Sequence, residues 1–188
     1  EALVQDQFDT AEQLAEAAIE YARRSKDTPL LKRAVARNRD LKAEIEELKK
    51  YQPAVQQATA VVGQNPNDPA ANLTLGRYAC FVKGQWDKGL PRLALCGDAV
   101  LKDLAAKELQ ENQASVELAK VADAWWDLGE KESGLPKKHL REHALSLYRQ
   151  SLPGLVGLER DRVEARVKAN ESSQAESKKV ETVLLFDG

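Results

Sequence analysis

Residues 65–90 read NPNDPAANLTLGRYACFVKGQWDKGL, and this stretch decides the fold. Its prolines mark a break in the chain, where Asp68 can cap a helix that starts at Pro69. Gly84 ends that helix, and a second helix is predicted over Trp86–Leu95. The stretch therefore predicts two consecutive helices joined by a short turn, which is the unit of a helical hairpin.

The rest of the chain carries the same punctuation. Ala, Leu, Glu, Lys, Gln and Arg dominate the composition, and these residues are strong helix formers. The 10 Gly and 7 Pro residues cluster between helical patterns. Further helices are predicted over residues 99–110, 115–128, 136–152 and 157–170. No strand is predicted before residue 178, so the predicted fold class is all-α.

Two longer patterns precede this region. The first places apolar residues on one helix face at Phe8, Ala11, Ala15, Ala18 and Ala22. The second keeps a 3-4 spacing over three heptads at Leu31, Ala34, Asn38, Leu41, Ile45 and Leu48. Thr28 and Pro29 separate the two, because Thr28 can cap a helix and Pro29 can open one. The patterns predict a long antiparallel helical hairpin, in which the polar Asn38 can fix the register.

Three parts are expected along the chain. Residues 1–64 form the hairpin and a short third helix, and residues 65–170 form a repeat region that continues the same domain. Residues 171–188 are expected to be a linker and the start of a following domain, because most of them are polar without helical periodicity. Val183–Phe186 is the only strand candidate. The chain begins at Glu1 and contains no Met, which indicates a piece of a longer or processed protein.

Three pieces of the sequence carry a repeat signal. The first is QFDTA at residues 7–11. The second combines LGRY at residues 75–78 with GQWDKGL at residues 84–90, and the third combines VADAW at residues 121–125 with Ala144 and Tyr148. These pieces resemble tetratricopeptide repeats, although Gly89 stands where Ala is usual and residues 131–138 lengthen the third piece. The resemblance implies antiparallel helical hairpins stacked as a right-handed array.

A narrower resemblance covers three segments. Residues 65–86, the AWWDL motif at residues 124–128 and residues 148–158 are similar to a helical module of large, mostly uncharacterised bacterial proteins. In those proteins the module usually precedes a lectin-like β-sandwich. The terminal LLFDG at residues 184–188 resembles the opening strand of such a sandwich, of the kind grouped with 3-keto-disaccharide hydrolases. The resemblance implies the helical part of an exported, multidomain protein.

Charge and hydropathy argue against two classes of partner. The formal net charge is −2 and the pI is near 5.9, whereas a nucleic-acid footprint needs a basic excess. The densest basic stretch, residues 32–42, is followed at once by glutamates and is interpreted as a solvated helix face. No apolar run has the length of a membrane span. We therefore expect neither nucleic acid nor a membrane span.

The segment His139-Leu140-Arg141-Glu142-His143 matches the H-x-x-E-H pattern of inverted zinc proteases. Two histidines four residues apart share a helix face and can both reach a metal. They are the only histidines in the chain, however, and the lysines and arginine around them disfavour a dication. We therefore expect a solvated helix flank, with His139 and His143 as weak metal candidates and no bound cofactor.

The two cysteines, Cys80 and Cys96, lie where the two helices of one repeat would face each other. Two cysteines do not form a disulfide framework. Buried reduced thiols and a single disulfide in an exported protein both remain open.

The sequence contains no glycine-rich phosphate loop and no recognisable nucleophile, so we expect no enzyme activity. The predicted function is a scaffold or protein-interaction domain that binds a protein or another domain of the same parent chain. The tetratricopeptide-like alignment assigns five residues to the concave surface: Arg77, Phe81, Asp123, Trp126 and Asp127. The alternative is an accessory domain of an extracellular carbohydrate-binding or carbohydrate-acting protein, in which a glycan is the ligand.

Overall fold

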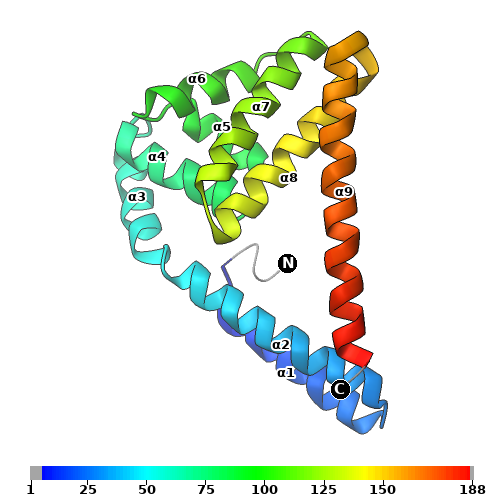
Figure 1. Cartoon of the computed structure of the whole chain (residues 1–188). Coiled ribbons are helices and arrows are strands. Elements are labelled where there is room, and N and C mark those ends of the chain that lie inside the picture. The colour runs from blue at the N-terminus through cyan, green and yellow to red at the C-terminus, as the bar shows by residue number, and fades with distance from the viewer. Residues whose placement is uncertain (1–5, 187–188) are drawn as a thin grey trace. The chain divides into compact units, whose positions relative to one another are not determined.

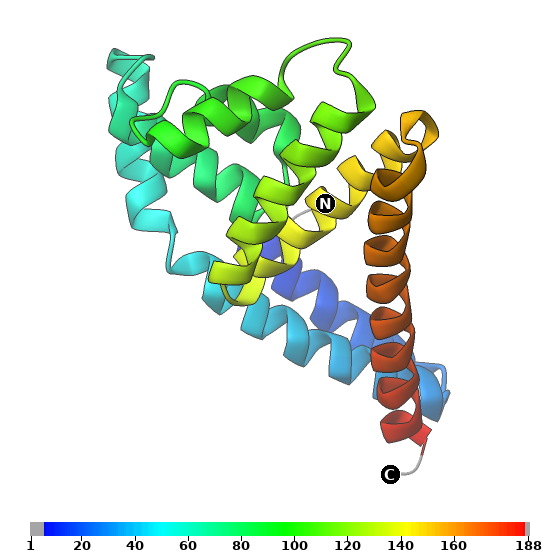
Figure 2. The same ribbon diagram turned by 45° about the horizontal axis from the view of Figure 1, so that its top comes forward.

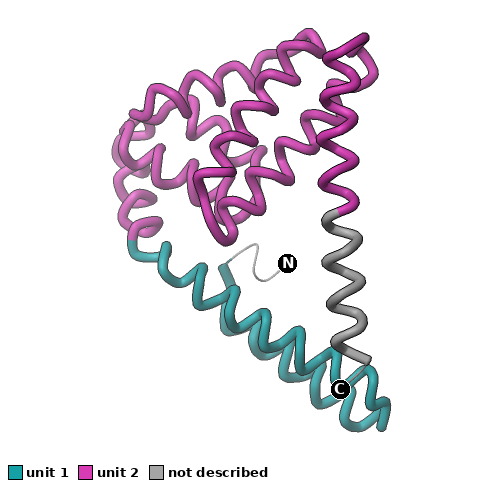
Figure 3. The backbone as a smooth tube through the Cα atoms, in the orientation of Figure 1, with its two compact units in different colours: residues 1–53 teal, residues 54–188 magenta. Residues whose placement is uncertain are grey.

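The computed structural model describes the backbone of residues 6–186 and the side chains of residues 6–172. Within that range every regular element is a helix, which confirms the all-α prediction (Figure 1). The chain divides into two compact units, residues 1–53 and 54–188 (Figure 3). The boundary expected from the sequence, after residue 64, differs because most of helix α3 (Gln52–Gln64) is grouped with the second unit.

The first unit is a helical hairpin made of α1 (Phe8–Arg24) and α2 (Thr28–Lys49). Asp27, rather than Thr28, caps α2, since its carboxylate accepts a hydrogen bond of 2.8 Å from the backbone nitrogen of Leu30. Two ion pairs join the helices in antiparallel order, Lys42 to Glu16 at 3.8 Å and Lys49 to Glu12 at 4.0 Å. The 3-4 pattern predicted for the second helix ends in a buried stretch at Leu41, Ile45 and Leu48.

The second unit contains the remaining elements, α3 to α9. They are α4 (Pro69–Arg77), a π-helical turn η1 (Tyr78–Val82), α5 (Trp86–Leu93), α6 (Ala99–Glu108), α7 (Ser115–Lys131), α8 (Gly134–Ser151), a 3-10 turn η2 (Leu152–Gly154) and α9 (Gly157–Phe186). The predicted cap of α4 is confirmed, and α6 has a cap of the same kind. Asp68 accepts from the backbone nitrogen of Ala71 at 2.8 Å, and Asp98 accepts from those of Val100 and Leu101 at 3.0 Å.

Close helix packing explains one departure from the repeat pattern. A Cβ atom built on Gly89 would lie 2.9 Å from the backbone nitrogen of Cys80 and would overlap its sulfur. Alanine therefore does not fit at this position without movement of the backbone. The glycine lets α5 approach the π-helical turn, with which it is in contact.

The core of the second unit is built around large side chains from several helices. Trp125 of α7, Tyr148 of α8 and Leu93 of α5 are fully buried, together with Leu155 and Val163 from the α8–α9 region. Helices α7 and α8 lie side by side in both views of the ribbon, and α9 contacts α8 (Figures 1 and 2). This packing fixes the relative positions of α7, α8 and α9, which carry the candidate site.

The predicted end of the chain needs correction. Residues 171–182 were expected to form a linker and Val183–Phe186 a strand, but α9 continues as helix from Gly157 to Phe186. The segment contains no Gly or Pro to stop the helix, and its Glu, Gln, Ala and Lys residues favour helix formation. The last two residues, 187 and 188, where a following domain was expected to start, lie outside the described residues. No helix among the described residues has the length and apolar character needed to cross a membrane.

Candidate functional site

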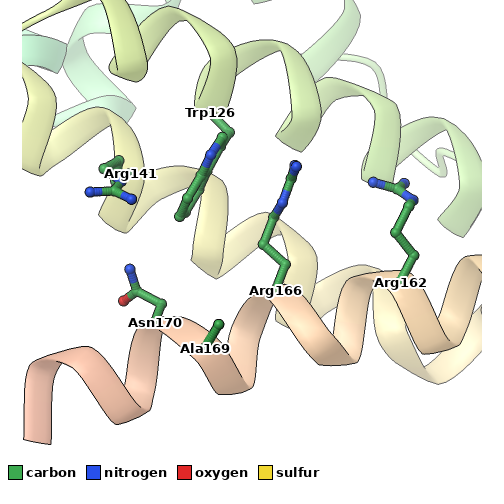
Figure 4. A pocket seen from close by; sticks show the side chains of 6 residues that line it. All are labelled: Trp126, Arg141, Arg162, Arg166, Ala169 and Asn170. Atoms are coloured by element: carbon green, nitrogen blue, oxygen red, sulfur yellow. The ribbon is translucent and has the colours of Figure 1, made fainter.

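An open pocket of about 430 Å³ lies in the second unit, between α7, α8 and α9 (Figure 4). Its lining consists of Trp126, Arg141, Arg162, Arg166, Ala169 and Asn170. Among the described side chains of the lining three are arginines and none is acidic, although the whole chain has a net charge of −2. The pocket is therefore a local concentration of cationic hydrogen-bond donors.

Trp126 reaches this pocket because of its place on α7. Adjacent residues on a helix point about 100° apart, so Trp125 enters the core while Trp126 remains half-buried at its edge. The guanidinium carbon of Arg141 lies 4.5 Å from the centre of the Trp126 ring, and that of Arg166 lies 5.3 Å from it. Figure 4 shows the indole between these two arginines. Cation–π attraction holds all three side chains in place.

A second set of contacts fixes the arginines of α9. The Asp123 carboxylate accepts hydrogen bonds from Nη1 of Arg162 at 2.7 Å, from Nη1 of Arg166 at 3.0 Å and from the Tyr148 hydroxyl at 2.6 Å. Burial, and then the hydrogen bond to Asp123, raise the pKa of Tyr148 above its usual value, so the phenol keeps its proton and donates. The hydrogen bond to Asp123 likewise raises the pKa of Arg162. Asp123 is thus a positioning residue behind the pocket.

The structure separates the five predicted groove residues. Trp126 lines the pocket and Asp123 supports it, but the other three are not part of its lining. Arg77 pairs with Glu132 at 2.8 Å and lies over the ring of Phe81, and Asp127 is exposed. Phe81 is 1% exposed and belongs to the core, which corrects its assignment to a groove. It lies in the π-helical turn, where an extra residue changes the rotational phase of the side chains that follow.

The histidines of the H-x-x-E-H segment line a different pocket of about 410 Å³. Its lining is Lys83, Gly84, Trp86, His139, Glu142, His143 and Ser146. His139 Nδ1 lies 3.0 Å from the carbonyl oxygen of Phe81, and the His143 ring stacks on Trp86 with the ring centres 3.5 Å apart. In the described part of the chain, no three His, Cys, Asp or Glu side chains are grouped so that they could hold a metal ion.

His143 is mostly buried rather than a solvated flank, which corrects the sequence-based interpretation. Its Nε2 lies 2.7 Å from one carboxylate oxygen of Glu108, and the side chains are 11% and 8% exposed. The other oxygen of Glu108 accepts a hydrogen bond of 2.5 Å from the indole nitrogen of Trp125. Glu108 lies 35 residues before His143, so no local spacing in the sequence indicates this contact. The Glu108 carboxylate therefore links His143 to Trp125 inside the second unit.

Both cysteines are free thiols buried in the second unit, so the disulfide alternative is not realised. Cys80 is fully buried, and burial raises its pKa well above the usual value. A thiol that resists deprotonation is a poor nucleophile. Cys80 and Cys96 are therefore core residues.

Sequence reasoning missed the two arginines that α9 contributes. Arg162 and Arg166 are four residues apart on one helix and share a face, which is a visible signal. Their convergence with Trp126 and Arg141 was not visible, because it depends on how α9 packs against α8. Comparison with protein-family models, with curated proteins and with solved structures found no match to this chain.

Proposed function

We propose that the chain is a non-catalytic helical module that binds a protein, or another domain of the same parent chain, through the surface around Trp126. The observation that carries this proposal is the half-buried Trp126 between Arg141 and Arg166 at an open pocket. Trp and Arg are enriched among the residues that dominate the energy of protein interfaces. A preorganised cluster of both residue types is suited to anchor a partner.

The chemistry of the pocket argues against catalysis there. As far as the structure describes the side chains, its lining consists of Trp, Arg, Ala and Asn. Arginine stays protonated at all physiological pH values, and indole, methyl and amide groups do not ionise in that range. The lining therefore supplies neither a general acid, nor a general base, nor a nucleophile.

A protein ligand is favoured over a glycan by the arrangement of the indole. Sugar rings bind tryptophan by stacking on an open face, whereas the Trp126 ring lies between two guanidinium groups (Figure 4). A glycan would have to displace one of them. The accessory role in a carbohydrate-acting protein is therefore the second choice.

The tetratricopeptide-like array belongs to the same proposal. Two pairs of consecutive helices in the second unit pack on each other, α4 on α5 and α7 on α8. This pairing is what such an array requires, and the close approach at Gly89 serves the role that a small residue has in those repeats. A scaffold built in this way presents side chains from several helices on one surface.

Affinity capture with single variants tests the proposed surface. We expect Trp126→Ala to weaken binding of the captured partner at least about tenfold, as for a central interface residue. Arg77→Ala, at the position predicted from the sequence, and Lys120→Ala, on the exposed surface of α7, are expected to bind like the wild type. The captured partner is first identified by mass spectrometry. Its dissociation constant for each variant is then measured by interferometry. Equal binding by the Trp126 and Lys120 variants would rule out this surface.

A further inference from the structure

We propose that the pocket is a carboxylate site, which recognises an Asp or Glu side chain of the partner. This inference rests on the proposed function and assigns its ligand chemistry. Two guanidinium groups flank one indole, and among the side chains that the structure describes no acidic one lines the pocket. Planar guanidinium forks match the geometry of a carboxylate and can bind it through two parallel hydrogen bonds.

The donors available to a ligand belong to Arg141 and Arg166. Arg166 uses Nη1 for Asp123 and for the Tyr148 hydroxyl, at 3.0 and 2.6 Å. Its Nε and Nη2 take no part in these contacts, and the two terminal nitrogens of Arg141 take no part in the ion pair of its Nε with Glu130 at 3.1 Å. Both guanidinium groups lie beside the same indole ring, so their remaining N–H groups are at the pocket, where an anion can accept hydrogen bonds from them.

Arg162 offers fewer donors to a ligand, because each of its three nitrogens already makes a hydrogen bond. Nη1 donates to Asp123 at 2.7 Å, and Nε and Nη2 donate to Glu159 at 3.2 and 3.0 Å. Its contribution is to hold Asp123, which also orients Arg166. The anion site is therefore formed mainly by the two arginines that flank Trp126.

The charge balance around the pocket disfavours an anion with more than one negative charge. The three lining arginines are each paired with at least one carboxylate: Arg141 with Glu130, Arg162 and Arg166 with Asp123, and Arg162 also with Glu159. The three carboxylates nearly neutralise the charge of the three arginines, although they do not use all of the arginine N–H groups. A phosphate dianion would meet more repulsion from them than a carboxylate would. The volume, about 430 Å³, is within the range of pockets that hold whole side chains or small ligands.

Side-chain NMR with a matched pair of ligands tests the inference. The probes are glutamate and glutamine blocked as N-acetyl N-methylamides, which differ only in carboxylate against amide, and inorganic phosphate. All are titrated into the protein at constant ionic strength, and the indole and arginine Nε–H resonances are followed. We expect blocked glutamate to give saturable shifts at Trp126, Arg141 and Arg166. The buried Trp125 indole, which donates to Glu108, provides an unmoved reference.

Two variants keep the test decisive. Arg166→Gln is expected to weaken glutamate binding about tenfold, the usual effect of losing a charge-assisted hydrogen bond. Arg166→Gln also removes the hydrogen bond to Tyr148, so a second variant is needed that leaves the contacts of Asp123 intact. Arg141→Gln is such a variant, because Arg141 pairs with Glu130, and it is expected to weaken glutamate binding to the same extent. Lys120→Gln is the control and is expected to bind like the wild type.

Three results would overturn the carboxylate assignment: no saturable shift with blocked glutamate, equal shifts with blocked glutamine, or tighter binding of phosphate. None of these results decides the proposed function. If Trp126→Ala still abolishes partner capture, protein binding at this surface stands and only the ligand chemistry is wrong. If capture is unaffected, the proposed function fails whatever the titration shows.

Discussion

Replacing Trp125 with alanine is expected to lower the free energy of unfolding by about 3–5 kcal/mol, the usual cost of removing a large buried aromatic. The side chain is fully buried and contacts the rings of Trp86 and Phe81, with ring centres 5.1 and 6.2 Å away. Its loss also leaves Glu108 without its indole donor. Urea unfolding followed by circular dichroism measures the change.

The neighbouring residue provides a matched control. Trp126→Ala removes the same side chain one position along α7, but from the edge of the core rather than from its centre. We expect a loss of only about 1–2 kcal/mol, which reflects partial burial and the two cation–π contacts. Equal losses in both variants would mean that the assignment of one ring to the core and the other to the pocket is wrong.

Glu108→Ala is expected to cost about 3 kcal/mol, because two mostly buried groups lose their partner at once. The Glu108 carboxylate, which is 8% exposed, faces Nε2 of His143 at 2.7 Å and the Trp125 indole nitrogen at 2.5 Å. The alanine variant leaves both of those nitrogens unsatisfied inside the second unit. Urea unfolding measures this change in the same way as for Trp125.

Two further variants show whether the hydrogen bonds are responsible. Glu108→Gln keeps an acceptor for the Trp125 indole and is expected to be less destabilising than Glu108→Ala. Glu117→Ala removes a glutamate from the exposed surface of α7 and is expected to have no measurable effect. An unchanged stability of Glu108→Ala would contradict the contacts assigned to His143 and Trp125.

The local signals in the sequence predicted the helices and their starting points well. Asp68 and Asp98 have short side chains that cap the following backbone nitrogens, and such a contact spans only a few residues. The 3-4 spacing of apolar residues up to Leu48 likewise predicts which face of α2 is buried. These features depend on neighbours in the chain, so the sequence alone is sufficient to identify them.

Features that depend on distant residues were missed. The contact of Glu108 with His143 joins α6 to α8, and the pocket joins α7, α8 and α9. The burial of Phe81 follows from a π-helical turn, which no simple periodicity indicates. The pairing of Asp123 with Arg166 crosses 43 residues. The sequence-based alignment assigned Trp126 and Asp123 to one concave surface, but the arginines that surround them come from elsewhere in the chain.

Site-specific photocrosslinking tests most directly whether a partner binds at the Trp126 pocket. A benzophenone amino acid is introduced at Ala169, an exposed residue of the pocket lining, or at Lys120, an exposed residue of α7 outside it. Irradiation in living cells is followed by mass spectrometry of the adducts. We expect a discrete protein adduct from position 169 that disappears when Trp126→Ala is added, and none from position 120. Adducts of equal yield from both positions, or an adduct from position 120 alone, would contradict this expectation.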